Sequence, residues 1–193
     1  HGPLVKGGLL SDAQDTFLRL FCVGAGVRRD VVEHGLGRDA VAVLSSCGLL
    51  VDVLGGLGGG SEYCVGAVQL FPFSGLLLAT DWPSETLGPE GDAVMAIGTD
   101  SMELCLCLGE GPARTSCAVG AAVLDLCTGS GVAALYAALC GAARVVAVDV
   151  SPRACMFAKV NAALNGLDIT VHCGDLYAAL PPTESPFDLI LAN

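Results

Sequence analysis

The chain of 193 residues is long enough for one full domain or for two small ones with a buried core. Hydrophobic residues make up 53% of it and charged residues 15%, a composition that excludes an intrinsically disordered protein. The formal net charge of −11 argues against broad, non-specific binding to nucleic acid, because phosphate contacts require lysine and arginine.

Neither a membrane span nor a metal site is expected. Two long uncharged stretches, 63–80 and 126–143, are interrupted by Gly, Ser, Thr, Gln or Pro, which favours buried strands and a buried helix. The ten cysteines include no Cys-x-x-Cys pair, and the three histidines are scattered. We expect a reduced, intracellular, cytoplasmic protein whose thiols fill its core, with an organelle left open. The chain begins at His1 without an initiator methionine, which indicates a fragment.

Residues 1–80 are expected to form a small N-terminal α+β module. The predicted elements are helices over 11–22, 28–36 and 37–48, strands over 49–54, 62–71 and 75–82, and a flexible turn at 55–60. Three short helices followed by a hairpin outline a winged helix. The alternative is a small helical module whose hairpin packs on the next domain. This alternative is favoured over DNA binding, because the third helix contains Asp39 beside Arg38 in sequence and the hairpin carries only acids.

A Pro/Gly-rich, acidic segment, 81–91, is expected to link this module to a second domain, 92–193. A strand, a helix and a loop are predicted first, over 93–98, 99–110 and 111–120. The chain then alternates between strands at 122–127, 144–150, 167–173 and 187–193, helices at 131–142 and 151–166, and a loop or short helix at 174–182. This alternation predicts βαβ units around a parallel sheet, a Rossmann-like α/β fold truncated after the fourth strand.

A glycine loop, Thr128-Gly129-Ser130-Gly131, follows the first of these strands. It fits the dinucleotide pattern G-x-G-x-x-G weakly, since the third glycine is replaced by Ala134. Asp125, inside the strand, would repel a pyrophosphate but favours the ammonium and the sulfonium of S-adenosylmethionine. The expected ligand is therefore a cation without phosphates, and the glycines serve close approach of the backbone.

Two further acids follow the next two strands. Asp149 ends the second strand, where a carboxylate can accept both ribose hydroxyls, a feature common to dinucleotide and S-adenosylmethionine sites. Gly174-Asp175-Leu176 follows the third strand, where a carboxylate can accept the adenine amino group. The alternative for Asp175 is an Asx-turn, and for Asp149 a helix cap. Three acids at the carboxyl ends of three successive strands favour a ligand site at that edge.

These residues resemble a known family. The stretches "VLDLCTGSGVAAL", "VVAVDVSPRACMFAKVNAALNG", "GDLY" and "FDLILAN" are similar to successive motifs of class I S-adenosylmethionine-dependent methyltransferases. The group most similar is the "methyltransferase small domain" proteins, which include release-factor glutamine and RNA-guanine N-methyltransferases. The resemblance covers about residues 92–193. It implies that Asp125, Thr128, Gly129, Gly131, Asp149, Asp175 and Leu176 bind S-adenosylmethionine.

The resemblance also implies a catalytic residue. The family carries Asn-Pro-Pro-Tyr/Phe at the end of the fourth strand, and Asn193 would be its first residue. The Asn amide oxygen and the next carbonyl would hold a planar NH₂ group, and the aromatic ring would stack on the substrate. The Pro-Pro-aromatic is absent here, so residues 1–193 alone are expected to bind cofactor weakly and to show no turnover.

The expected function is thus methyl transfer to a planar nitrogen, on a protein glutamine amide (a release-factor-like partner) or on a nucleobase amine of RNA. The low content of lysine and arginine favours a protein substrate over RNA. Two alternatives remain, an NAD(P)-binding oxidoreductase domain and a non-catalytic module that keeps the cofactor fold as a scaffold. No membrane partner and no metal are expected.

Overall fold

The computed structural model describes residues 10–54, 62–83, 93–109 and 116–193. The predicted turn 55–60 and most of the predicted linker, residues 84–91, lie outside the described residues. Contacts within the chain define two compact units, residues 1–70 and 71–193. The extents predicted from the sequence for the two modules, 1–80 and 92–193, differ from this grouping mainly in one hairpin, which belongs with the C-terminal unit.

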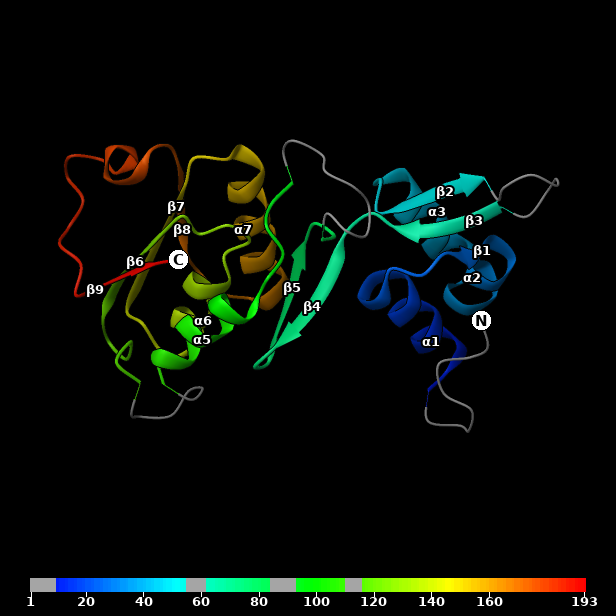
Figure 1. Ribbon diagram of the computed structural model, residues 1–193, viewed down its shortest axis with the longest axis horizontal. Helices are drawn as coiled ribbons and strands as arrows, with labels where there is room; N and C mark the ends of the chain where they lie inside the picture. The colour runs from blue at the N-terminus through cyan, green and yellow to red at the C-terminus, as the bar shows by residue number, and fades with distance from the viewer. Residues whose placement is uncertain (1–9, 55–61, 84–92, 110–115) are drawn as a thin grey trace. The chain divides into compact units, whose positions relative to one another are not determined.

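The N-terminal unit has the helix and strand order predicted for a winged-helix-like module, with one additional short strand (Figure 1). The elements are α1 (Asp12–Leu18), the π-helical turn η1 (Arg19–Val23), β1 (Val27–Arg28), α2 (Arg29–Leu36), α3 (Arg38–Ser46), β2 (Leu50–Leu54) and β3 (Glu62–Gly66). As expected, Ser11 caps the first helix, because its hydroxyl accepts the backbone N–H of Gln14. The three strands form an antiparallel sheet in the order β1-β3-β2. Its core comprises Leu20, Phe21, Val27, Val32, Val41, Leu50 and Cys64.

Two predicted strands are wrong. The segment 62–71 is divided, because the chain turns after β3 and then forms β4 (Gln69–Phe73), which pairs with β5 (Leu76–Thr80) in a separate sheet. The N–H of Ala67 donates to the carbonyl of Leu49 at this turn. The segment 93–98 is irregular, because the N–H of Val94 donates to the carboxylate of Asp81 (2.8 Å) and no strand pairs with it in the described part of the chain.

The C-terminal unit is built on a parallel four-stranded sheet, which confirms the Rossmann-like fold (Figure 1). After α5 (Thr99–Cys107) the elements are β6 (Ala122–Leu126), α6 (Val132–Leu139), β7 (Arg144–Asp149), α7 (Pro152–Asn165), β8 (Thr170–Cys173), the 3-10 helix η2 (Leu176–Ala179) and β9 (Leu189–Ala192). The strand order is β8-β7-β6-β9, and all three pairings are parallel. The order reverses between β6 and β9, which is where open α/β sheets bind ligands.

Both faces of this sheet are apolar, as expected for parallel strands. One face packs against α6 and α7, with Val123, Val145 and Ala147 contributing to the main core. The alternate residues Leu124, Leu126, Val146 and Val148 form a second cluster on the opposite face, against Ala179, Leu180 and Phe187. Small residues let α6 approach closely, since its residues 132–137 are all buried.

The cysteines correct one expectation. All ten are free thiols, but only Cys64, Cys105, Cys140 and Cys155 are buried, and five are exposed. Thiols therefore fill the core at four positions rather than at most of them. Among the helices that the structure describes, none has the length and apolar character needed to cross a membrane.

Candidate cofactor and substrate site

The loop between β6 and α6 is held in a conformation that requires glycine at one position. Cys127, Gly129 and Gly131 all have positive φ, of 58°, 56° and 88°. A Cβ on Gly131 would lie 3.0 Å from the backbone Cα of Ala158 in α7, whereas a Cβ on Gly129 would meet only Val94 at 3.9 Å. Gly131 is thus needed for helix packing, and Gly129 leaves space on the side of segment 93–97.

Asp125 lies beneath this loop and is 2% exposed. One carboxylate oxygen accepts the hydroxyl of Thr128 (2.5 Å) and the backbone N–H of Ala134 (3.1 Å). Burial raises the pKa of Asp125 to about 6, although these two hydrogen bonds favour the ionised form. The structure therefore brings Asp125 and Thr128 together, with the carboxylate bound to the protein itself; direct contact of Asp125 with a cofactor stays a prediction.

Asp149 joins the end of β7 to the same loop. Its carboxylate accepts the backbone N–H of Gly129 (2.8 Å) and that of Ser151 (2.9 Å). The carbonyl of Asp149 accepts the N–H of Gly174, which brings the end of β8 alongside. Asp149 is partly exposed, so its carboxylate can still reach a ligand at this edge.

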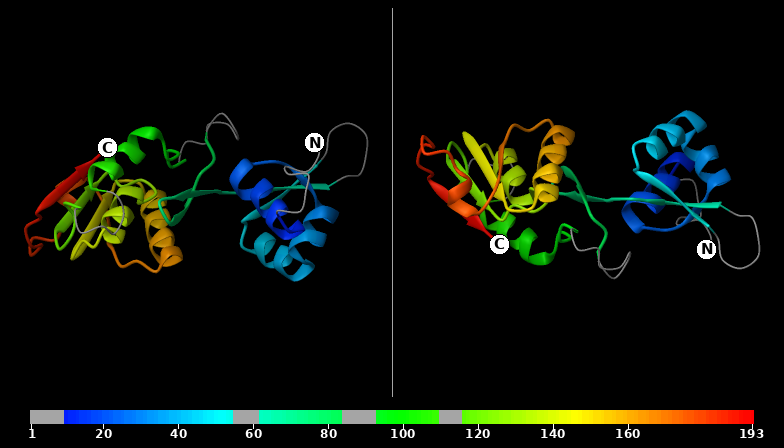
Figure 2. Two further views of the ribbon diagram at one scale, coloured as in Figure 1. Left: turned by 90° about the horizontal axis from the view of Figure 1, so that it is seen from below. Right: turned by 90° about the horizontal axis from the view of Figure 1, so that it is seen from above.

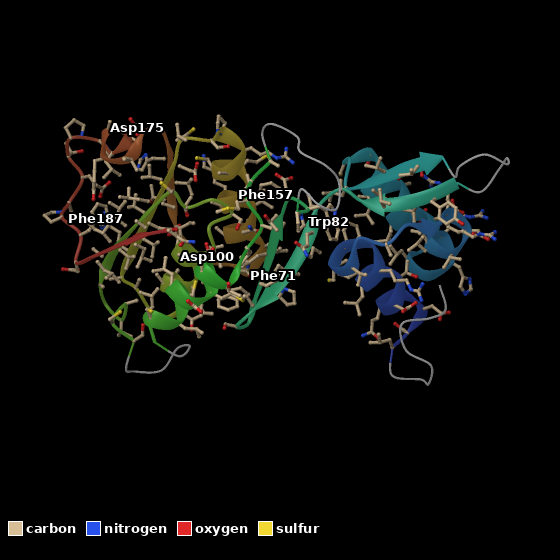
Figure 3. All side chains as sticks on the ribbon, viewed as in Figure 1. Phe71, Trp82, Asp100, Phe157, Asp175 and Phe187 are labelled. Atoms are coloured by element: carbon tan, nitrogen blue, oxygen red, sulfur yellow. The ribbon has the colours of Figure 1, made fainter. Side chains whose placement is uncertain are left out.

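Asp175, labelled in Figure 3, and Leu176 follow β8. Both residues are exposed. Asp175 precedes η2, and its carbonyl accepts the N–H of Ala178. No hydrogen bond joins these two residues to the glycine loop or to the side chain of Asp149 in the described structure, so their predicted contact with adenine stays a prediction.

A pocket lies beside the glycine loop. It is lined by the loop and the start of α6, by Met95, Ala96 and Ile97, by the α5 residues Ser101 and Leu104, and by Asn193 at the end of β9. The side-chain amide of Asn193 donates to the carboxylate of Asp100 (3.2 Å) and to the hydroxyl of Ser101 (3.1 Å). Figures 2 and 3 show the C-terminal residue and Asp100 near the start of α5.

Sequence reasoning missed the contribution of residues 95–104 to this pocket. The segment was predicted as a strand leading into a helix, with no role at the site. The signal that could have found it is Gly98-Thr99-Asp100, a glycine followed by an acidic first helical turn. Asp81 was also not predicted to have a role here. Its carboxylate accepts the backbone N–H of Val94 and forms an ion pair with Arg153 at the start of α7.

The comparisons with known proteins match mainly the C-terminal part of the chain. Residues 123–193 match the family model described as "Methyltransferase domain". The ribosomal protein L11 methyltransferase of Pelobacter propionicus is 53% identical over 73 residues, which are 37% of this chain and 23% of that protein. The ribosomal protein uL3 glutamine methyltransferase of Burkholderia pseudomallei is 47% identical over 79 residues, 37% of this chain and 26% of that protein.

Among solved structures, the ribosomal protein L11 methylase of Lactobacillus delbrueckii subsp. bulgaricus is 33% identical and covers 49% of this chain and 46% of that one, with a TM-score of 0.39. The chain spans about a quarter of the length of the two curated relatives. The matched segment runs from β6 through β9 and so contains the glycine loop, Asp149 and Asn193.

Residues 123–193 form part of a class I S-adenosylmethionine-dependent methyltransferase domain. This confirms the resemblance, and it decides the choice of cofactor in favour of S-adenosylmethionine over a nicotinamide dinucleotide.

The residues of the methyltransferase domain fit that cofactor. Asp149 ends β7 and Asp175 follows β8, both at the carboxyl edge of the sheet; neither lines the described pocket, whose lining contains no Lys or Arg. Such a charge pattern suits a ligand with two cationic centres and a ribose, and it suits a pyrophosphate poorly. In the described part of the chain no cluster of three His, Cys, Asp or Glu side chains could hold a metal ion.

Proposed function

We propose that this protein transfers a methyl group from S-adenosylmethionine to a nitrogen of a protein, with the glutamine amide of a ribosomal protein as the first candidate acceptor. The names of the two curated relatives support a ribosomal protein substrate. The net charge of −11 supports it too, because an acidic protein attracts a basic protein surface and repels RNA. The free thiols support a reducing, cytoplasmic location.

The observation that carries the proposal is the placement of Asn193. Both contacts of its amide group use the nitrogen as donor, toward Asp100 and Ser101. These contacts orient the amide oxygen as the atom that can accept an N–H from a substrate. The residue lines the same pocket as Gly129, so a nitrogen held there lies beside the cofactor loop.

The chemistry demanded of the protein is mainly alignment. The cofactor supplies a methyl group on a positively charged sulfur, which is already a good leaving group. An amide nitrogen is a weak nucleophile, so Asn193 contributes by holding it in line with the methyl carbon. The apolar side chains of Met95, Ile97 and Leu104 line the same space.

Transfer of labelled methyl groups to purified ribosomal proteins L11 and uL3 tests the proposal with the full-length protein. We expect Asn193→Ala to lower kcat about 100-fold or more. Its affinity for S-adenosylhomocysteine, measured by calorimetry, should remain within about twofold of the unchanged protein. Equal losses of kcat and of cofactor affinity would assign Asn193 to the cofactor site instead. Label found in ribosomal RNA rather than in protein would transfer the proposal to a nucleobase acceptor.

The cofactor assignment has its own test. Asp149→Ala should weaken binding of S-adenosylhomocysteine about tenfold or more, because the ribose and the N–H of Gly129 both lose an acceptor. The control is Asp168→Ala, which removes an exposed acid outside the pocket. NAD should not bind any of these proteins, and tight NAD binding would revive the oxidoreductase alternative. Cofactor binding without transfer to any acceptor would favour the non-catalytic module.

A further inference from the structure

Helix α7 binds strand β5 through two asparagines that lie one helical turn apart. The amide of Asn161 accepts the N–H of Ala79 (2.7 Å) and donates to its carbonyl (2.8 Å). The amide of Asn165 binds Leu77 in the same way, at 2.9 and 2.8 Å. Two side chains thus take the place of a neighbouring strand along one edge of β5, which leaves its backbone groups satisfied inside the protein.

The two asparagines differ in their third hydrogen bond. The Nδ2 of Asn161 also donates to the carbonyl of Ser130 in the glycine loop (2.8 Å). The Nδ2 of Asn165 donates instead to the carbonyl of Asn161, within its own helix (2.7 Å). Asn161 is 0% exposed and Ser130 is 3% exposed, so water does not compete for the bond between them.

The Ser130 carbonyl lies between the two glycines whose positive φ values shape the loop, Gly129 and Gly131. A loop held in such a conformation persists only where its surroundings fix it. Asn161 restrains the loop at this carbonyl, because its own amide is held by the backbone N–H and carbonyl of Ala79.

The residue that follows this strand contacts a second segment that lines the pocket. Two residues after Ala79, the carboxylate of Asp81 accepts the N–H of Val94, next to the pocket residues Met95 and Ala96. β5 is therefore connected to the glycine loop through Asn161, and the residue after it, Asp81, is connected to the segment that continues into Met95 and Ala96.

We propose that Asn161 is a positioning residue of the cofactor site, which ties the glycine loop to β5 and holds it in the conformation that receives S-adenosylmethionine. This inference rests on the cofactor assignment above. Asn165 makes the equivalent contacts to β5 without touching the loop, so it serves as the matched control.

The test compares Asn161→Asp with Asn165→Asp in the full-length protein. Each change replaces an NH₂ donor by an oxygen atom and removes two hydrogen bonds to backbone carbonyls. Asn161→Asp loses the bonds to Ala79 and Ser130, and Asn165→Asp loses those to Leu77 and Asn161. Only the bond to Ser130 reaches the glycine loop. We expect Asn161→Asp to lower the Tm more than Asn165→Asp, because Asn161 is fully buried and Asn165 is partly exposed. Affinity for S-adenosylhomocysteine should fall at least tenfold in Asn161→Asp and less than twofold in Asn165→Asp, at a temperature where both are folded.

Amide hydrogen exchange without ligand gives a second readout. Exchange of the Gly129 and Gly131 amides should accelerate at least tenfold in Asn161→Asp and remain unchanged in Asn165→Asp. Equal effects of the two variants on affinity and exchange would overturn the proposal. If the aspartate variants do not fold, the pair Asn161→Ala and Asn165→Ala applies the same comparison without a charge. Absence of S-adenosylhomocysteine binding by the unchanged protein would refute the cofactor assignment, while the exchange result would still decide whether Asn161 holds the loop.

Discussion

Asp125 combines a carboxylate, complete burial and only two hydrogen-bond donors. Burial raises its pKa to about 6, while the hydroxyl of Thr128 and the N–H of Ala134 favour the charged form and the nearby Asp149 opposes it. In an unfolded chain the pKa of an Asp is about 3.9. The protonated carboxyl is therefore favoured in the folded protein, and Asp125 stabilises the fold below pH 4 relative to pH 7.

The corresponding prediction concerns the free energy of unfolding as a function of pH. Because the pKa is raised on folding, the contribution of Asp125 is fully present below about pH 4 and is lost as the pH rises through 6. A shift of this size corresponds to at most about 3 kcal/mol. Urea unfolding of the unchanged protein and of Asp125→Asn between pH 4 and 7 measures it. As the pH rises, the free energy of unfolding of the unchanged protein should fall relative to that of Asp125→Asn. A difference between the two free energies that stays constant with pH would contradict the raised pKa.

At the scale of the elements, the glycine loop and α7 form one packed unit. Gly131 begins α6 with a φ of 88°, and the closest atoms to a Cβ there belong to Ala158. Gly141, after α6, has a similar φ of 91°, but a Cβ there would meet only Val119 at 3.9 Å. Both glycines therefore have a positive φ, but only Gly131 is in close contact with another helix.

We predict that Gly141→Ala loses about 1–2 kcal/mol of stability, the cost of a left-handed residue with a Cβ. Gly131→Ala should lose about 1–3 kcal/mol more, because α7 must shift to admit the methyl group. Thermal or urea unfolding of both variants gives the two values. Equal losses of stability in the two variants would show that α7 can shift away from the loop without a loss of stability.

The local sequence pattern predicted some strands and helices correctly and others not. Strands β6 to β9 and helices α6 and α7 were located correctly because short strand segments alternate with helical segments at the spacing of βαβ units, and α7 has clear caps in Ser151 and Gly166. Segment 93–98 has the apolar composition of a strand but no strand partner in the described structure, since Asp81 binds its backbone. Partner choice is a tertiary property that the local pattern does not contain.

At the scale of the whole molecule, the ten thiols divide by exposure. Cys47, Cys107, Cys117, Cys127 and Cys173 are exposed, while Cys64, Cys105, Cys140 and Cys155 are buried. Burial raises the pKa of the Cys105 thiol to about 12 and that of Cys64 to about 11, which removes the reactive thiolate at neutral pH.

Titration with a thiol reagent should therefore proceed in two stages. The exposed cysteines should react within minutes in the folded protein, and the four buried ones only after denaturation. Mass spectrometry of the labelled peptides identifies which cysteines reacted. Labelling of Cys105 in the folded protein, or fewer than ten thiols after denaturation without reductant, would contradict this assignment.

The parallel α/β fold and the position of the glycine loop followed from the sequence, which also favoured S-adenosylmethionine over a dinucleotide, because the alternation of strands and helices and the spacing of motifs are local properties of the chain. Three other features appear only in the folded structure: Asp125 is buried, segment 95–97 and α5 line the pocket beside Asn193, and Asn161 joins the glycine loop to β5. These features depend on residues far apart in the chain, Ala79 and Asn161 among them, whose contact arises only when the helix and the strand pack together.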